Sequence, residues 1–109
     1  MKYGMVFSIE MYDAEKQEEH SILSMPGDYI RMSKWADENL EPMASETANA
    51  LRRNYVTAWF AISRRGKLEE FGLPAKLTVE AVDAMADRFT VYVEEVEEGS
   101  LPLTKAPFK

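Results

Sequence analysis

The chain of 109 residues is 46% hydrophobic, contains no cysteine and carries a formal net charge of −6. This length fits one domain, and the lack of cysteine excludes disulfides, thiolate metal ligands and cysteine nucleophiles. The acidic balance disfavours general nucleic-acid binding, and no apolar run approaches the roughly 20 residues of a membrane-spanning helix. The first residues, MKYGMVFSIEMYD, are not expected to act as a signal peptide, because their apolar stretch is interrupted and acids follow early.

The N-terminal residues predict a β-strand with one buried face. Apolar and polar residues alternate there, and the apolar set is Tyr3, Met5, Phe7, Ile9 and Met11. The charged stretch 13–20 is expected to connect this strand to a second, short strand over 21–25. Two strands alone are only marginally stable, so we expect helices to cover their apolar face.

A first helix is expected over 29–40. Pro26 and Gly27 form a turn before it, and the Asp28 carboxylate can accept the free N–H groups of the first helical turn. Pro42 ends this helix, because the residue before a proline avoids the α region. The side that faces the core contains Tyr29, Met32, Trp35, Ala36 and Leu40, with Met43 just beyond.

The clearest helical periodicity lies in the central stretch TANALRRNYVTAWFAISRRG. Ser45 or Glu46 begins this helix, and Gly66 is a natural residue to follow its end. Arg64 and Arg65 lie in the last turn, where positive charge suits the helix dipole. The predicted core-facing stripe follows the i, i+3, i+4, i+7 spacing and contains Ala48, Leu51, Tyr55, Ala58, Trp59 and Ile62.

The last third of the chain predicts a connector over 67–74 and then a long helix over 79–96. The connector has apolar residues that can hold it on the core, namely Leu68, Phe71 and Leu73. Thr78 is the predicted N-cap of the long helix. One face of this helix would carry Val79, Val82, Met85, Ala86, Phe89, Val93 and Val96.

One feature opposes that long helix. Thr90, Val91 and Val93 form a β-branched cluster that indicates a strand instead, although the unbroken apolar stripe favours the helix. Residues 99–109 contain two prolines and are expected to form an extended tail after a globular domain over 1–98. The predicted fold is α+β and mainly helical, with an N-terminal β-hairpin packed against about three helices.

The candidates for chemistry are few, and each has an ordinary structural interpretation. His20 is expected to be a solvated connector residue, because no nucleophile or orienting partner accompanies it. Asp83 and Asp87 place two carboxylates at i and i+4, but without further ligands a solvated acidic face is preferred to a metal site. The acidic run 94–98 could attract a basic partner, although such runs usually only solvate a surface. We expect no enzyme activity, no metal and no cofactor.

The central helix also predicts a surface for binding a partner. Arg53, Phe60 and Arg64 share the side opposite the core stripe, at i, i+7 and i+11. Aromatic residues and arginine are enriched at the centres of protein interfaces. The alternative is that Phe60 packs under the connector or against the hairpin.

The end of the central helix resembles a known family. Residues 58–66, AWFAISRRG, resemble the A-W-x-A-x-x-R-x-G type of helix end in tail assembly chaperones of long-tailed (siphovirus-type) bacteriophages. The turn PGD at 26–28 with the helix containing Trp35, the EFGLP stretch at 70–74 and the AVDAMAD stretch at 81–87 are also similar. The resemblance runs from about residue 27 to the C-terminus. Family members often carry an acid in the middle of the first helix, where this chain has SKW at 33–35.

The resemblance implies a non-enzymatic function in the morphogenesis of phage or prophage tails. Such proteins coat the tape measure protein, recruit tail tube protein and self-assemble around their client. They act in the cytoplasm of the host bacterium, without nucleic acid or membrane, and are not expected in the mature virion.

Two alternatives from other classes stay open. One is a small regulatory binding module, antitoxin-like or transcription-associated, which a folded C-terminal tail that forms a dimer, with a basic groove, would favour. The other is a small enzyme, which would need a pocket lined by His20, Asp83, Asp87 or Tyr55 in convergent geometry.

Overall fold

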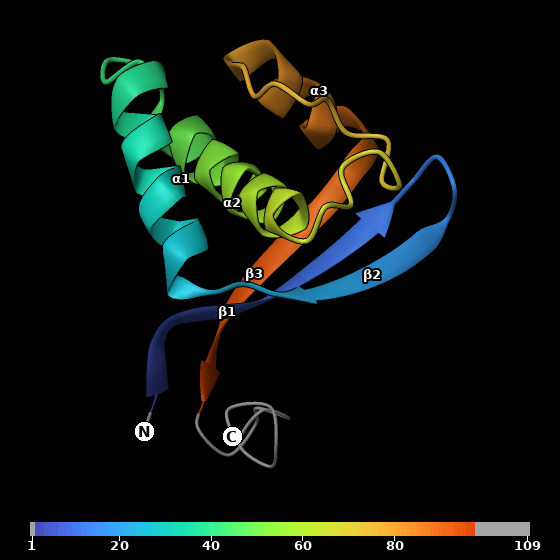
Figure 1. Cartoon of the computed structure of the whole chain (residues 1–109). Helices are drawn as coiled ribbons and strands as arrows, with labels where there is room; N and C mark the ends of the chain where they lie inside the picture. Colours follow the sequence, from blue (N-terminus) through green and yellow to red (C-terminus); the bar gives the residue numbers. More distant parts are fainter. Residues whose placement is uncertain (1, 98–109) are drawn as a thin grey trace.

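A three-stranded antiparallel sheet carries a layer of helices on one face (Figure 1). The computed structural model describes the backbone of residues 2–97 and the side chains of residues 7–94. The strands run in the order β2-β1-β3, so the N-terminal strand is central. This arrangement confirms the predicted α+β class. The elements are β1 (Lys2–Asp13), β2 (Glu18–Leu23), α1 (Pro26–Asn39), α2 (Glu46–Arg64), α3 (Val79–Arg88) and β3 (Phe89–Glu97).

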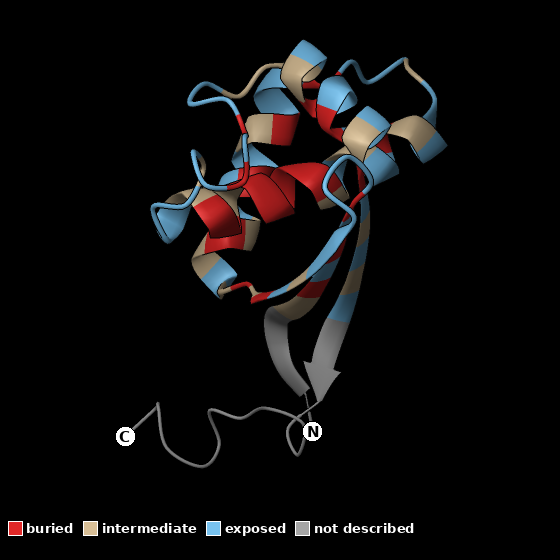
Figure 2. Ribbon diagram, turned by 90° about the vertical axis from the view of Figure 1, so that its right-hand side faces the viewer, coloured by how far each residue is buried: buried red, intermediate tan, exposed pale blue. Residues whose placement is uncertain are grey.

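The alternation in β1 separates the two faces of the sheet as predicted. Ile9 and Met11 are buried under the helices, whereas Glu10 and Tyr12 are exposed on the opposite face. Ile9 lies opposite Ile22 of β2 and Val93 of β3, so the apolar side chains of all three strands share the covered face. Figure 2 shows how buried residues concentrate between the sheet and the helices.

The hairpin connection is shorter than the predicted 13–20. β1 extends to Asp13 and β2 begins at Glu18, so the turn occupies only the residues between them. The Asp13 carboxylate accepts the backbone N–H groups of Glu15 at 2.9 Å and Lys16 at 3.2 Å. An acid that binds the backbone just after it favours a tight turn, which the charge pattern alone did not locate.

The first helix begins earlier than predicted, and its N-cap is Met25, not Asp28. Pro26 occupies the first helical position. An N–H at this position would have no acceptor within the helix, so proline loses no hydrogen bond there, and its fixed φ suits the helix. Asp28 is therefore inside the first turn, and its carboxylate accepts the Met25 N–H at 2.9 Å. Met43 follows the end of α1 and is 90% exposed.

The predicted limits of the central helix are correct. The Ser45 hydroxyl accepts the Ala48 N–H at 3.3 Å. At the other end Gly66 adopts a φ of 70°, and its N–H donates to the Ser63 carbonyl at 2.9 Å. Lys67 N–H then donates to the Ile62 carbonyl at 3.1 Å, which completes a Schellman motif.

The buried surface of α2 is wider than one stripe, and it excludes one predicted member. Val56, Thr57 and Ala61 are buried in addition to the predicted residues, because α2 contacts α1, α3 and the sheet. Leu51, however, is 55% exposed. Figure 1 shows α2 between the other two helices.

The predicted long helix over 79–96 is wrong. Thr78 is its N-cap, as expected, since its hydroxyl accepts the Ala81 N–H at 3.0 Å. The helix ends at Arg88, and the chain continues as β3, which pairs with β1. Pairing with β3 satisfies the main-chain groups along the second edge of β1, and a third strand makes the two-stranded hairpin into a sheet that can be stable. The predicted tail, 99–109, lies outside the described residues.

None of the helices in the described part of the chain is long and apolar enough to cross a membrane.

Candidate partner-binding hollow

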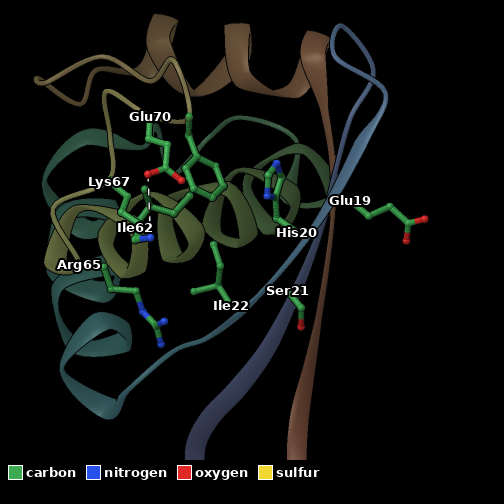
Figure 3. Close-up of a pocket in the computed structure, with 9 residues that line it drawn as sticks. Glu19, His20, Ser21, Ile22, Ile62, Arg65, Lys67 and Glu70 are labelled. Atoms are coloured by element: carbon green, nitrogen blue, oxygen red, sulfur yellow. Dashed lines mark ion pairs between the residues drawn. The ribbon is translucent and has the colours of Figure 1, made fainter.

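One hollow, of about 330 Å³, lies between β2, the end of α2 and the connector that follows α2 (Figure 3). We call it the β2 hollow. It is near the lower end of the range of about 300–1,000 Å³ for ligand pockets. Its lining residues are Glu19, His20, Ser21, Ile22, Ile62, Arg65, Lys67, Glu70 and Phe71.

The floor of the β2 hollow is apolar. Ile22 from β2, Ile62 from α2 and Phe71 from the connector are all buried. Phe71 is held there by a turn in which its N–H donates to the Lys67 carbonyl at 3.1 Å. The Schellman motif at Gly66 reverses the chain and brings this connector back beside β2.

The rim of the β2 hollow carries more positive than negative groups. Arg65 Nη2 donates to the Leu23 carbonyl at 2.8 Å, and no carboxylate of the described residues lies within ion-pair distance of Arg65. Lys67 Nζ lies 3.9 Å from Glu70 Oε1, so that pair is neutral. In Figure 3 the Glu19 side chain points away from the hollow. A chain of net charge −6 thus presents a locally cationic hollow with an apolar floor, which suits a group that combines a carboxylate with carbon atoms.

His20 lies in β2, not in a connector, and its side chain is 30% exposed. Its ring packs against Phe71, with ring centroids 4.5 Å apart, and its Nε2 lies 3.8 Å from Glu18 Oε1. The prediction of a loop histidine is therefore wrong, because β2 begins earlier than the apolar run suggested. Its position makes it one wall of the β2 hollow.

The three residues of the predicted contact surface have different environments. Arg64 is occupied by Asp28, whose side chain is fully buried: Arg64 Nε donates to Oδ1 at 3.0 Å and Nη2 donates to Oδ2 at 3.0 Å. Phe60 is half-buried against the core and meets Trp59 edge-on, with ring centroids 5.1 Å apart. Arg53 is exposed and lines a second hollow with Tyr29 of α1. The structure therefore does not present these residues as one free surface, although whether they bind a partner stays a prediction.

The ionised, buried carboxylate of Asp28 holds the Arg64 side chain in place. Burial alone would raise the pKa of its carboxyl, but hydrogen bonds from Arg64, the Met25 N–H and Arg31 outweigh burial and hold the pKa below its ordinary value. Arg31 Nη2 lies 3.0 Å from Oδ1. A buried carboxylate with these partners is ionised at neutral pH and ties the start of α1 to the end of α2.

The residues required by the enzyme alternative do not share one hollow. Arg52 Nε donates to Asp83 Oδ1 at 2.8 Å, and Tyr55 donates its hydroxyl to the Phe89 carbonyl at 2.6 Å. Both Tyr55 and Asp83 line a hollow between α2 and α3, whereas His20 lines the β2 hollow. Burial raises the pKa of Tyr55 above its ordinary value. Among the side chains of residues 7–94 no group of three or more His, Cys, Asp or Glu could hold a metal ion.

The comparisons with known proteins add no relative: no family model, curated protein or solved structure matches this chain.

The sequence patterns did not predict that Arg65, Lys67 and Phe71 line one site. The helix-ending signal at Gly66 was visible, and it places Arg65 and Lys67 on either side of a chain reversal. It did not reveal that the reversed chain lies against β2.

Proposed function

We propose that this chain is a tail assembly chaperone of a long-tailed bacteriophage or prophage. It would bind the tape measure protein and recruit tail tube protein in the host cytoplasm, without catalysing a reaction. The proposal starts from the resemblance of the AWFAISRRG stretch and its neighbours to that family. One structural observation supports it: three of the similar stretches, at 26–28, 58–66 and 70–74, contact one another.

Two contacts join these stretches. The arginine of the A-W-x-A-x-x-R-x-G pattern is Arg64, and it pairs at 3.0 Å with Asp28 of the PGD stretch, which forms the first turn of α1. The tryptophan of the pattern is Trp59, whose Nε1 donates to the carbonyl of Pro74, the last residue of EFGLP, at 3.0 Å. Three of the similar stretches therefore hold one another in place in the fold.

The surface of the domain is suited to binding a protein partner. Besides the β2 hollow, several large apolar side chains are exposed on the helices, on the loop between α1 and α2 and on the open sheet face. An extended or helical client could cover such side chains and gain the free energy of their burial. The exposed set among the described side chains is Tyr12, Ile30, Met43, Leu51 and Tyr92.

The first test is the order of genes around this reading frame. We expect a very long coiled-coil gene just downstream, with an overlapping −1 frame between the two. The second test is co-expression of this chain with the product of that gene and with the tail tube protein, followed by co-purification through a tag on the chaperone. The absence of such a gene, or a client that stays unbound, would overturn the proposal. A stable dimer with no client would instead favour the regulatory module.

The predicted contact surface is tested in the same assay. If Arg53→Glu combined with Phe60→Ala leaves the fold intact and client binding unchanged, that surface is not the one used. Arg64 is left out of this variant, because its loss would leave the buried Asp28 carboxylate without its main counter-charge.

A further inference from the structure

The outer edge of β2 has main-chain groups that no strand of the described residues covers. The sheet order makes β2 an edge strand. Ser24 N–H donates to the Phe7 carbonyl at 2.8 Å, which fixes the phase of the ladder between β1 and β2. Hydrogen-bonded and non-bonded pairs alternate in an antiparallel ladder, so Leu23 directs its N–H and C=O away from β1. The bond from Arg65 Nη2 to the Leu23 carbonyl, at 2.8 Å, agrees with this direction.

Glu19 and Ser21 have the same phase as Leu23. Their N–H and C=O groups therefore also face outward, away from β1. Their side chains lie on the open sheet face, while those of His20 and Ile22 lie on the side of the β2 hollow. A strand added along this edge would place every second side chain over the hollow.

The charge of the hollow selects the side chain that such a strand would present. Arg65 has no carboxylate of the described residues within ion-pair distance, and Lys67 is matched only by Glu70 at 3.9 Å. The floor below them is apolar. An Asp or Glu side chain fits this combination, because its methylene groups can pack on the floor while its carboxylate meets the guanidinium.

We infer that an extended segment of a partner protein pairs with the outer edge of β2 as a fourth strand and places an acidic side chain in the β2 hollow. This deepens the proposed chaperone function and rests on it, because it names how one client segment is held. Main-chain hydrogen bonds to β2 supply affinity, and the hollow supplies specificity. A free small carboxylate would use the hollow alone and leave the main-chain groups of Glu19 and Ser21 unpaired.

The test uses the full chain and random nonapeptides displayed on phage. Peptides are selected on the wild-type protein and counter-selected on Arg65→Glu. We expect the enriched peptides to contain Asp or Glu within an otherwise apolar or β-branched stretch. Their binding is expected to fall at least 10-fold on Arg65→Glu and to stay within 2-fold on Lys34→Glu, a matched charge reversal on exposed α1. Lys67→Gln, which keeps the bond between Arg65 and Leu23, is expected to weaken binding less.

The strand pairing is tested by Ser21→Pro. Proline removes an outward N–H and is tolerated at an edge that needs no donor, so the fold is expected to persist while peptide binding is lost. Ser21→Ala is the matched control, since Ser21→Pro also removes the hydroxyl that donates to Glu10 Oε2 at 2.8 Å. Circular dichroism of each variant establishes that the fold is retained.

Several results would overturn the inference. The first is that no peptide is enriched on the wild-type protein relative to Arg65→Glu. The second is that the enriched peptides contain no Asp or Glu. The third is that the Ser21→Pro variant binds the peptides as tightly as the Ser21→Ala variant does. If millimolar glutarate produces the same amide shifts at Glu19 and Ser21 as an enriched peptide, the site serves a small carboxylate and not a strand. A failure here combined with co-purification of the tape measure protein would leave the chaperone function standing and move its contact surface elsewhere.

Discussion

Replacing Arg64 by Met should strongly destabilise the protein, because it leaves the Asp28 carboxylate buried without its main counter-charge. The Asp28 side chain is 0% exposed and the Arg64 side chain is 33% exposed. Breaking a buried ion pair costs about 3–5 kcal/mol, but Arg31 and the Met25 N–H remain as partners of Asp28. The partial exposure of Arg64 lowers the cost further, so we expect about 2–3 kcal/mol.

Urea unfolding at pH 7, followed by tryptophan fluorescence and circular dichroism, measures this loss. At about 4–8 °C per kcal/mol for a domain of this size, the melting temperature should fall by roughly 10–20 °C. Arg53→Met is the matched control, since Arg53 is exposed and should change the free energy of unfolding by less than about 0.5 kcal/mol. In a double-mutant cycle with Asp28→Asn, the two losses should not add, with a coupling of about 1–2 kcal/mol. Equal effects of Arg64→Met and Arg53→Met, or strict additivity, would refute the assignment of Arg64 to Asp28.

Three further outcomes follow from single contacts. The hydrogen bond from Arg88, together with backbone N–H groups, outweighs burial and lowers the pKa of Asp13 from 3.8 to about 2. Because the pKa is lower in the folded state than in the unfolded state, the protein should lose stability as the pH falls from about 4 to about 2. Asp13→Asn should make this loss smaller in unfolding curves measured across that pH range. Gly66 and Gly72 both have positive φ, but a Cβ at Gly66 would meet nothing within 4 Å, whereas a Cβ at Gly72 would lie 3.0 Å from Arg88 Nη1. Calorimetry should therefore show that Gly66→Ala lowers the free energy of unfolding by about 1 kcal/mol and that Gly72→Ala lowers it by more. Leu51→Ala should cost less than about 1 kcal/mol in urea unfolding, because Leu51 is 55% exposed; a loss of 2 kcal/mol or more would place it in the core after all.

The parts of the fold that were predicted correctly depend on residues close together in the chain. The Ser45 and Thr78 caps each bind an N–H three residues later, and Gly66 ends α2 through carbonyls within five residues. The alternation in β1 likewise needs only its own residues. A pattern within one turn or one strand carries its own physical cause, so these elements could be predicted without knowing what packs against them.

β3 could not be assigned from local pattern, because two periodicities agree on some of its residues. Phe89 and Val93 are four apart, so they share a face both in a helix and in a strand. Val91 and Tyr92 separate the two cases: Val91 is half-buried and Tyr92 is 61% exposed, as period two requires. What decides between them is pairing with β1, which lies about 80 residues earlier and offers an unpaired edge.

The β2 hollow was invisible for the same reason. The rings of His20 and Phe71 are in contact, with centroids 4.5 Å apart, although all of α1 and α2 lies between the two residues in the sequence. Neither residue has a neighbour in sequence that signals the other. A histidine in a charged stretch therefore gave the ordinary interpretation of a solvated loop, which the position of β2 then replaced.

The adjacent arginines at the end of α2 divide the resemblance into a part that explains folding and a part that can explain binding. Arg64, the arginine of the pattern, is committed to Asp28, so its presence follows from the fold. Arg65 occupies the variable position before Gly66 and faces the β2 hollow, where it bonds to the edge of β2. Under the proposed function, a domain built this way could keep the pair that joins α1 to α2 while the next residue changes with the client. The residue that selects a partner would then lie at a position that the pattern leaves open, which is why a motif search alone would overlook it.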